Sequence, residues 1–132
     1  MDLVTLAAWV LNALIGFYLL YLWLSGGGLR QQATKVTRFP TALIFSHPAL
    51  AVSALACWVG YLLTGQRMLA WLAFAVLSAA ALLGFTMFTR WLGRGRHARG
   101  AEQRFPLLAV LAHGVVGVTT FVLVLLAASS IN

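Results

Sequence analysis

Residues 106–129, with the sequence PLLAVLAHGVVGVTTFVLVLLAAS, decide the fold class of this chain. The stretch contains no charged side chain, and a bilayer core requires about 20 mostly apolar residues for one helical span. Three further apolar runs cover residues 3–25, 40–64 and 68–91. Because 62% of the chain is hydrophobic and 8% is charged, a water-soluble domain cannot account for the composition. The sequence therefore predicts an all-α bundle of four transmembrane helices, forming one domain over residues 1–132.

The basic residues predict the orientation of the bundle, because Lys and Arg beside span ends are retained in the cytoplasm. Only Arg67 lies between the second and third runs. The others flank the first and third loops: Arg30, Lys35, Arg38, Arg90, Arg94, Arg96, Arg99 and Arg104. We expect both termini outside and these two loops in the cytoplasm, with the chain in the inner or plasma membrane. Anionic lipid headgroups are the expected partners of the basic side chains, and nucleic acid is not.

Several kinds of site are excluded by the residues that are missing. Cys57 is the only cysteine, which excludes an internal disulfide, a C-x-x-C redox pair and covalent haem attachment. Asp2 and Glu102 are the only acids and lie outside the predicted spans, unlike the intramembrane carboxylates that proton and cation transporters use. The glycines at 26–28 have no Gly-Lys-Ser/Thr after them, so they predict a flexible helix exit and no phosphate loop.

An internal repeat relates the two halves of the chain. Arg38-Phe39-Pro40 and Arg104-Phe105-Pro106 are each followed by six residues and a histidine, in the pattern R-F-P-x6-H. Gly16-Phe17 and Trp23-Leu24 recur at the same internal spacing as Gly84-Phe85 and Trp91-Leu92. We interpret this as two duplicated helical hairpins, residues 1–65 and 66–132. An even number of spans in each copy gives both the same orientation, and their pseudo-two-fold axis then lies along the membrane normal.

The repeat also predicts where its aromatic and glycine residues lie. We expect Phe39 and Phe105 in the aromatic belt at the headgroups, and Gly16 and Gly84 where helix backbones cross closely. The tryptophans are expected mostly at the interfaces, with only Trp58 buried.

The two repeat histidines, His47 and His113, are the candidate functional residues. An ionisable side chain inside the bilayer is a functional hypothesis by default, and each lies about 10 Å beyond its Arg-Phe-Pro cap. Small residues lie one turn further along, Ala51 beside His47 and Gly117 beside His113. Two imidazoles at one depth across a two-fold axis, with space beside them, are what a six-coordinate haem iron requires.

Other roles for the two histidines remain open. Small residues four apart also allow membrane helices to pack closely, and a buried neutral histidine can be satisfied by a backbone carbonyl. The pair could also serve another metal or a proton relay, although zinc or copper would need a third ligand at this depth. The alternative function is a non-catalytic scaffold or an accessory subunit of a larger complex, in which both histidines only fix packing.

In architecture and histidine placement, the chain resembles small b-type cytochrome membrane bundles, although it carries only two of the four histidines of the two-haem class. The resemblance implies one haem b near the cytoplasmic face and electron exchange with a quinone or a respiratory-complex subunit. The haem propionates would then point to that face, where Arg38 and Arg104 are the expected partners because Arg offers a forked donor to a carboxylate. Lys35 and Arg90 could assist from the adjoining helix ends.

Overall fold

The computed structural model describes residues 1–93 and 100–130, and this part of the chain contains helices and no strand. Four long helices form the bundle: α1 (Asp2–Ser25), α3 (Thr41–Thr64), α4 (Arg67–Leu92) and α5 (Leu107–Ser130). Two short elements lie in the loops, α2 (Gly28–Ala33) and the 3-10 helix η1 (Ala101–Arg104). Arg94, Arg96 and Arg99, which the topology prediction also uses, lie outside the described residues.

The four predicted spans are confirmed as helices, and each of their ends agrees to within one residue. All four are long and apolar enough to cross a membrane. Their ends are correct because the helices stop where the apolar sequence stops, at glycines, prolines and charged residues. The glycines at residues 26–28 do mark the exit from α1, which ends at Ser25, although the chain does not continue as an extended loop. Gly27 adopts a left-handed φ of 83°, and the chain turns there directly into α2.

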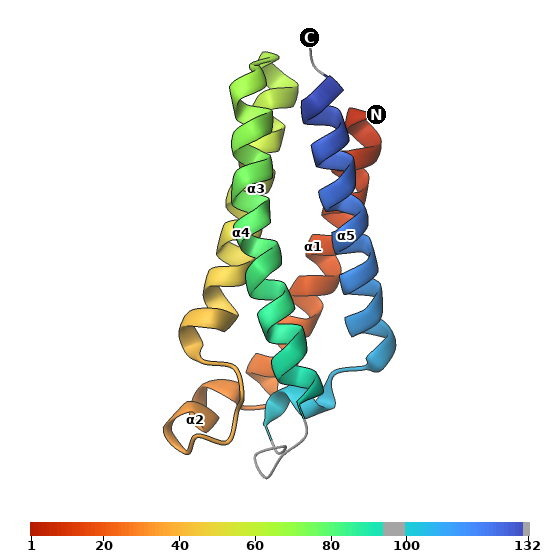
Figure 1. The fold of residues 1–132 in the computed structure, drawn as a ribbon. Helices are drawn as coiled ribbons and strands as arrows, with labels where there is room; N and C mark the ends of the chain where they lie inside the picture. Colours follow the sequence, from red (N-terminus) through yellow and green to blue (C-terminus); the bar gives the residue numbers. More distant parts are fainter. Residues whose placement is uncertain (94–99, 131–132) are drawn as a thin grey trace.

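The four long helices alternate in direction, so both termini lie at one end of the bundle and α2 and η1 at the other (Figure 1). α3 packs most extensively on α4, and α1 on α5, while contacts between α1 and α3 and between α4 and α5 are sparser. The two remaining pairs, α1 with α4 and α3 with α5, lie diagonally across the bundle. We call the two ends of the molecule the terminus end and the basic end.

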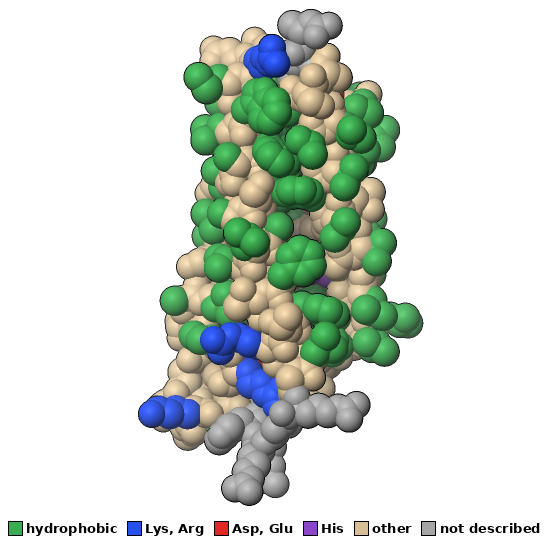
Figure 2. Space-filling view, in the orientation of Figure 1, with side chains coloured by type: hydrophobic (Ala, Val, Ile, Leu, Met, Phe, Trp, Pro, Cys, Tyr) green, Lys and Arg blue, Asp and Glu red, His purple; other side chains and the backbone are tan. Residues whose placement is uncertain are grey.

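The side chains on the outside of the bundle are predominantly apolar over most of its length (Figure 2). Charged side chains of the described chain are confined to the two ends, and five basic ones lie at the basic end: Arg30, Lys35, Arg38, Arg90 and Arg104. Arg67 lies at the terminus end, in the turn between α3 and α4. An apolar surface between polar ends is what a bilayer-spanning bundle presents to lipid.

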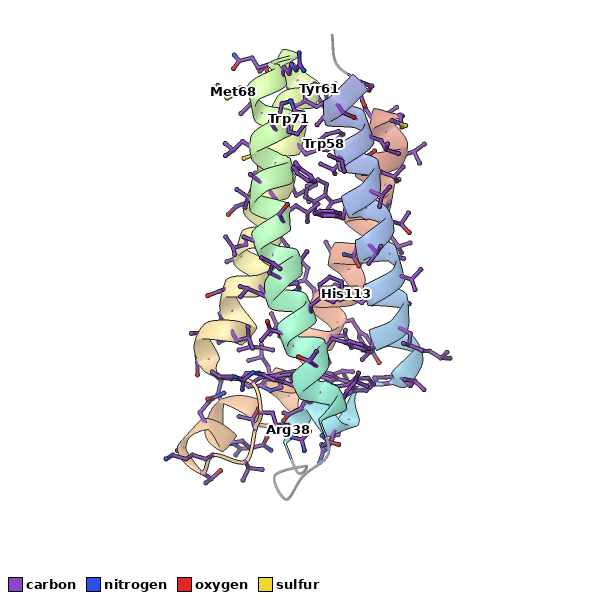
Figure 3. All side chains as sticks on the ribbon, in the orientation of Figure 1. Arg38, Trp58, Tyr61, Met68, Trp71 and His113 are labelled. Atoms are coloured by element: carbon purple, nitrogen blue, oxygen red, sulfur yellow. The ribbon has the colours of Figure 1, made fainter. Side chains whose placement is uncertain are left out.

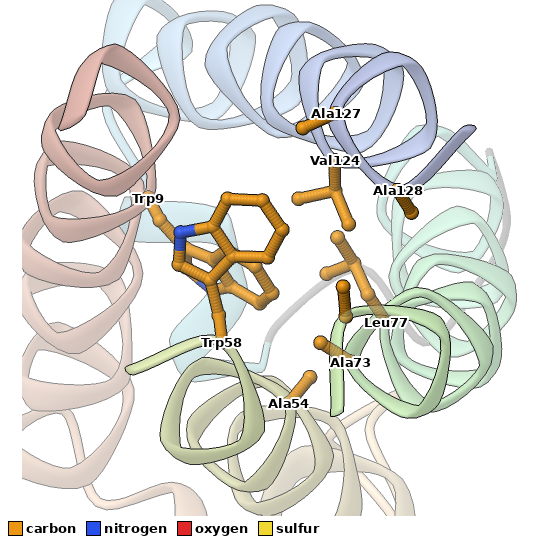
Figure 4. Packing of buried hydrophobic residues seen from close by; sticks show 9 residues of the cluster. Trp9, Ala54, Trp58, Ala73, Leu77, Val124, Ala127 and Ala128 are labelled. Carbon is orange, nitrogen blue, oxygen red and sulfur yellow. The ribbon is translucent and has the colours of Figure 1, made fainter. Parts of the chain in front are cut away.

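A core of tryptophan and small residues fills the terminus end. The Trp9 and Trp58 rings lie 6.3 Å apart between α1 and α3. Small and branched side chains from α3, α4 and α5 close around them (Figure 4): Ala54, Ala73, Leu77, Val124, Ala127 and Ala128. The sequence predicted that only Trp58 is buried among the tryptophans. That is wrong, because Trp9 and Trp23 are also buried.

The basic end is closed by a second cluster, in which the two repeat phenylalanines meet. The Phe39 and Phe105 ring centres lie 6.1 Å apart, and Phe39 is buried. The expected place of these phenylalanines in an aromatic belt facing the lipid headgroups is therefore wrong for Phe39. Trp23 is buried in the same cluster, and Trp91 packs against it.

Glu102, in η1, ties this cluster together although its side chain is fully buried. Its carboxylate accepts hydrogen bonds from Thr37 Oγ1 at 2.9 Å and from the Arg38 backbone N–H at 2.7 Å. Trp23 Nε1 donates to Thr37 Oγ1, and Trp91 Nε1 donates to the Glu102 carbonyl oxygen. These bonds fix the segment that leads into α3 against the segment that leads into α5.

Candidate functional site

The fold brings His47 and His113 together near the bundle axis. They lie on the diagonal helices α3 and α5, and Figure 3 shows His113 pointing into the space between the helices. The two ring centres are 6.0 Å apart, and the ring planes are inclined at 84°. They are the only histidines in the part of the chain that the structure describes. The pair is therefore the candidate site.

A backbone carbonyl of a neighbouring helix orients each imidazole. His47 Nδ1 lies 2.8 Å from the Ala80 carbonyl oxygen of α4, and His113 Nδ1 lies 3.2 Å from the Asn12 carbonyl oxygen of α1. Because a carbonyl oxygen can only accept, Nδ1 is the ring nitrogen that donates. The hydrogen of each neutral ring is thereby held on Nδ1, and Nε2 keeps its lone pair.

Glycine makes the space for both rings. A β-carbon built on Gly84 would lie 3.0 Å from His47 Cε1, and one built on Gly16 would lie 2.9 Å from His113 Cε1. Gly16 and Gly84 were expected at close crossings between helix backbones. The structure gives them a different role, because the imidazole of the adjacent helix occupies the place that a side chain would need.

The contacts of the two histidines are equivalent under the sequence repeat. Gly16 corresponds to Gly84, and the carbonyl acceptor comes in both cases four residues before that glycine, at Asn12 and at Ala80. Each histidine therefore packs on the first helix of the other hairpin in the same way.

A cavity of about 970 Å³ surrounds the histidine pair between the four helices. Its wall includes both histidines, both glycines and the two small residues that the sequence singled out, Ala51 and Gly117. Trp9 lines it toward the terminus end and Trp91 toward the basic end, each seven residues from its glycine and so about 10 Å along the helix. This volume lies within the range of about 300–1,000 Å³ that small-molecule and cofactor sites occupy.

The two predicted propionate partners lie at the basic end, and neither is part of the cavity wall in the described chain. Arg38 Nη1 donates to the Arg90 carbonyl oxygen at 3.1 Å, and Arg90 Nη1 donates to the Arg38 carbonyl oxygen at 3.1 Å. This reciprocal pair joins the start of α3 to the end of α4. Arg104 is exposed at the end of η1, and Lys35 is exposed with a positive φ of 54°.

Two residues that matter at this site were not singled out from the sequence. Asn12 lines the cavity, and Glu102 closes the basic end. Asn12 could have been noticed as the one amide side chain inside a predicted span, exactly one turn before Gly16. Burial of Glu102 has no signal in the sequence, since an acid in a polar loop is ordinarily solvated.

Within the described residues, no group of three or more His, Cys, Asp or Glu side chains could hold a metal ion. The site offers two nitrogen ligands and an apolar cavity. No protein-family profile, curated protein or solved structure matches the chain. The residues and geometry of the site are therefore the basis for its function.

Proposed function

We propose that this chain is an integral membrane protein that holds one haem b between His47 and His113 and carries single electrons within the membrane. The observation that carries the proposal is the approach of the two imidazoles across the bundle, with a ring separation of 6.0 Å. Two iron–nitrogen bonds of about 2 Å, plus roughly 1 Å from each nitrogen to its ring centre, require about 6 Å. Perpendicular ring planes are compatible with such ligation, because both planes can contain the line that joins the two ligand nitrogens through the iron.

The hydrogen bonds at Nδ1 support the same proposal. Histidine ligands in metal sites donate their second ring N–H to a carbonyl or carboxylate, which fixes the tautomer and increases the basicity of the ligand nitrogen. His47 and His113 both have such a bond, to Ala80 and Asn12. The lone pair on each Nε2 is then available to iron.

The apolar wall of the cavity would determine the chemistry of a bound haem. With two imidazole ligands the iron has no open position, which favours electron transfer over oxygen activation. The phenylalanine and tryptophan cluster at the basic end and the tryptophan core at the terminus end would exclude water. The electron would be exchanged with a membrane quinone or with a subunit of a respiratory complex.

Topology and propionate binding belong to the same proposal. The positive-inside rule assigns the basic end to the cytoplasm, with both termini outside the inner or plasma membrane. Haem propionates directed to that end would meet Arg38 and Arg104, which begin corresponding repeat motifs. To bind a propionate, the Arg38 side chain would have to give up its hydrogen bond to the Arg90 carbonyl oxygen. Lipid phosphates would contact the remaining basic side chains.

We also propose that the two hairpins, residues 1–65 and 66–132, arose by duplication. The matching contacts of His47 with Gly84 and of His113 with Gly16 support a pseudo-two-fold axis along the bundle. Most of the residues that correspond to α2 in the second half lie outside the described chain, so the support comes from the four long helices.

A scaffold or accessory subunit is the second candidate, and one observation favours it. Each imidazole already has a hydrogen bond and a glycine to pack against, so the pair is held in place without a ligand. Under this alternative the chain would assemble with a larger membrane complex, and the histidines would only join the hairpins.

An absorption spectrum of the purified protein, with haem supplied during expression, distinguishes the two candidates. We expect the spectrum of a low-spin b-type haem, which His47→Ala and His113→Ala should each abolish. His97→Ala is the matched control, because it removes a histidine from the loop outside the described residues and should leave the spectrum unchanged. A wild-type protein that stays colourless through a haem titration would leave the scaffold as the function.

A further inference from the structure

The cavity reaches the lipid-facing surface between α4 and α5. Residues of both helices line it and are also exposed on the outside: Leu82 and Phe85 on α4, and Leu111, Gly114, Val115 and Val118 on α5. Contacts between these helices are among the sparser ones in the bundle. Figure 2 shows a histidine side chain between the apolar side chains of this face, and Figure 3 places His113 between the two ribbons. We call this opening the α4/α5 window.

Gly114 keeps the window open. A β-carbon built on it meets no atom within 4 Å, so the glycine borders empty space. The corresponding residue of the first repeat is Pro48, which directly follows His47 and places a ring at the opposite seam, between α1 and α3. The two seams therefore differ in the residue that follows the histidine, a proline in the first repeat and a glycine in the second.

One polar side chain inside the cavity has no partner. The Asn12 amide lies against Gly117, where an added β-carbon would be 3.2 Å from Nδ2, and Asn12 Oδ1 is buried without a hydrogen-bond partner in the described structure. A buried acceptor without a donor costs free energy. The bundle does not require an amide here, since the corresponding position of the second repeat is Ala80.

The two hydroxyl side chains of the cavity wall already have hydrogen-bond partners. Ser78 Oγ donates to the Phe74 carbonyl oxygen at 2.8 Å, and Thr119 Oγ1 donates to the Val115 carbonyl oxygen at 2.9 Å. Both bonds lie within their own helices. Among the described side chains of this wall, Asn12 Oδ1 is thus the buried acceptor that has no hydrogen-bond partner.

From these observations we propose that the α4/α5 window admits an apolar, bilayer-dissolved alcohol or phenol, whose hydroxyl group donates a hydrogen bond to Asn12 Oδ1. The occupant comes from the bilayer because the window is bordered by lipid-facing apolar side chains at mid-length of the helices. It carries a hydroxyl because the unmet atom is an acceptor in an otherwise apolar space. Asn12 lies one turn from Gly16 toward the terminus end, so this subsite is beside the histidine pair and does not depend on haem.

Two probes of nearly the same shape test the hydrogen bond. 2-Naphthol carries the donor, and 2-methoxynaphthalene does not. Equilibrium dialysis of the protein in detergent micelles against empty micelles gives the dissociation constant of each. For each protein we divide the dissociation constant of 2-methoxynaphthalene by that of 2-naphthol. We expect this ratio to be about two- to tenfold higher for wild type than for the Asn12→Ala variant. The ratio cancels differences in micelle partitioning and in cavity size. An unchanged ratio would refute the role of Asn12.

Two tryptophan variants test the window. Gly114→Trp fills the opening, so the dissociation constants of both probes should rise by at least about two- to tenfold over wild type. Ala112→Trp is the control, because Ala112 is exposed on α5 away from the cavity wall. Equal binding by the two variants, with circular dichroism showing both folded, would refute access between α4 and α5. A colourless protein that still binds 2-naphthol through Asn12 would remove the haem proposal and retain this one.

Discussion

Replacing Gly16 with alanine introduces a methyl group into the space that the His113 ring occupies. The new carbon would lie 2.9 Å from His113 Cε1, whereas carbon atoms in contact lie about 3.5–4.0 Å apart. The ring must therefore move by about 0.6–1 Å. The Nδ1 hydrogen bond to the Asn12 carbonyl, at 3.2 Å in the wild type, would be stretched beyond its useful range.

The expected change in the free energy of unfolding combines three contributions. Overpacking costs about 1–3 kcal/mol, and the lost hydrogen bond about 0.5–1.5 kcal/mol. Alanine recovers about 1 kcal/mol because it is a better helix former than glycine. Gly16→Ala should therefore destabilise the protein by about 0.5–3.5 kcal/mol, and Gly84→Ala should behave alike, since its added carbon would be 3.0 Å from His47 Cε1.

Thermal unfolding in detergent, followed by circular dichroism, measures this effect. Gly114→Ala is the matched control, because it is the same substitution beside the same histidine and its added carbon meets no atom within 4 Å. The control should unfold at or slightly above the wild-type temperature. If Gly16→Ala were as stable as Gly114→Ala, the contact between glycine and imidazole would not be what positions His113, and the reasoning about the site would fail.

Three further predictions concern the ends of the bundle. A reporter enzyme that is active only outside the cytoplasm should be active when fused after Asn132 and inactive when inserted at Gly95; the reverse result would invert the topology. Arg38→Gln should weaken haem retention in a dialysis assay without removing the low-spin spectrum, whereas Arg67→Gln at the opposite end should not; equal retention would exclude a propionate contact. Glu102→Ala should lower the unfolding temperature by leaving the Arg38 N–H without its carboxylate acceptor, a loss of about 1–3 kcal/mol, and an unchanged melting curve would contradict this role.

The sequence was sufficient for the four long helices and their ends, whereas α2 and η1 were not predicted. A span of apolar residues bounded by prolines, glycines and charges is a local property, so α3 and α5 could be located without knowledge of their neighbours. The repeat also identified His47 and His113 as residues in equivalent positions. Their small neighbours, Ala51 and Gly117, do line the cavity that surrounds the pair.

Only the tertiary structure decided which atoms surround the site. A membrane helix is apolar on all sides, so its sequence does not reveal which side faces lipid and which faces another helix. For this reason Trp9, Trp23 and Phe39 were assigned to interfaces although they are buried. Burial of Glu102 and the unpaired Asn12 amide also arise from segments distant in the sequence. Likewise, only the arrangement of the four helices shows that Gly114 borders open space and lines the cavity.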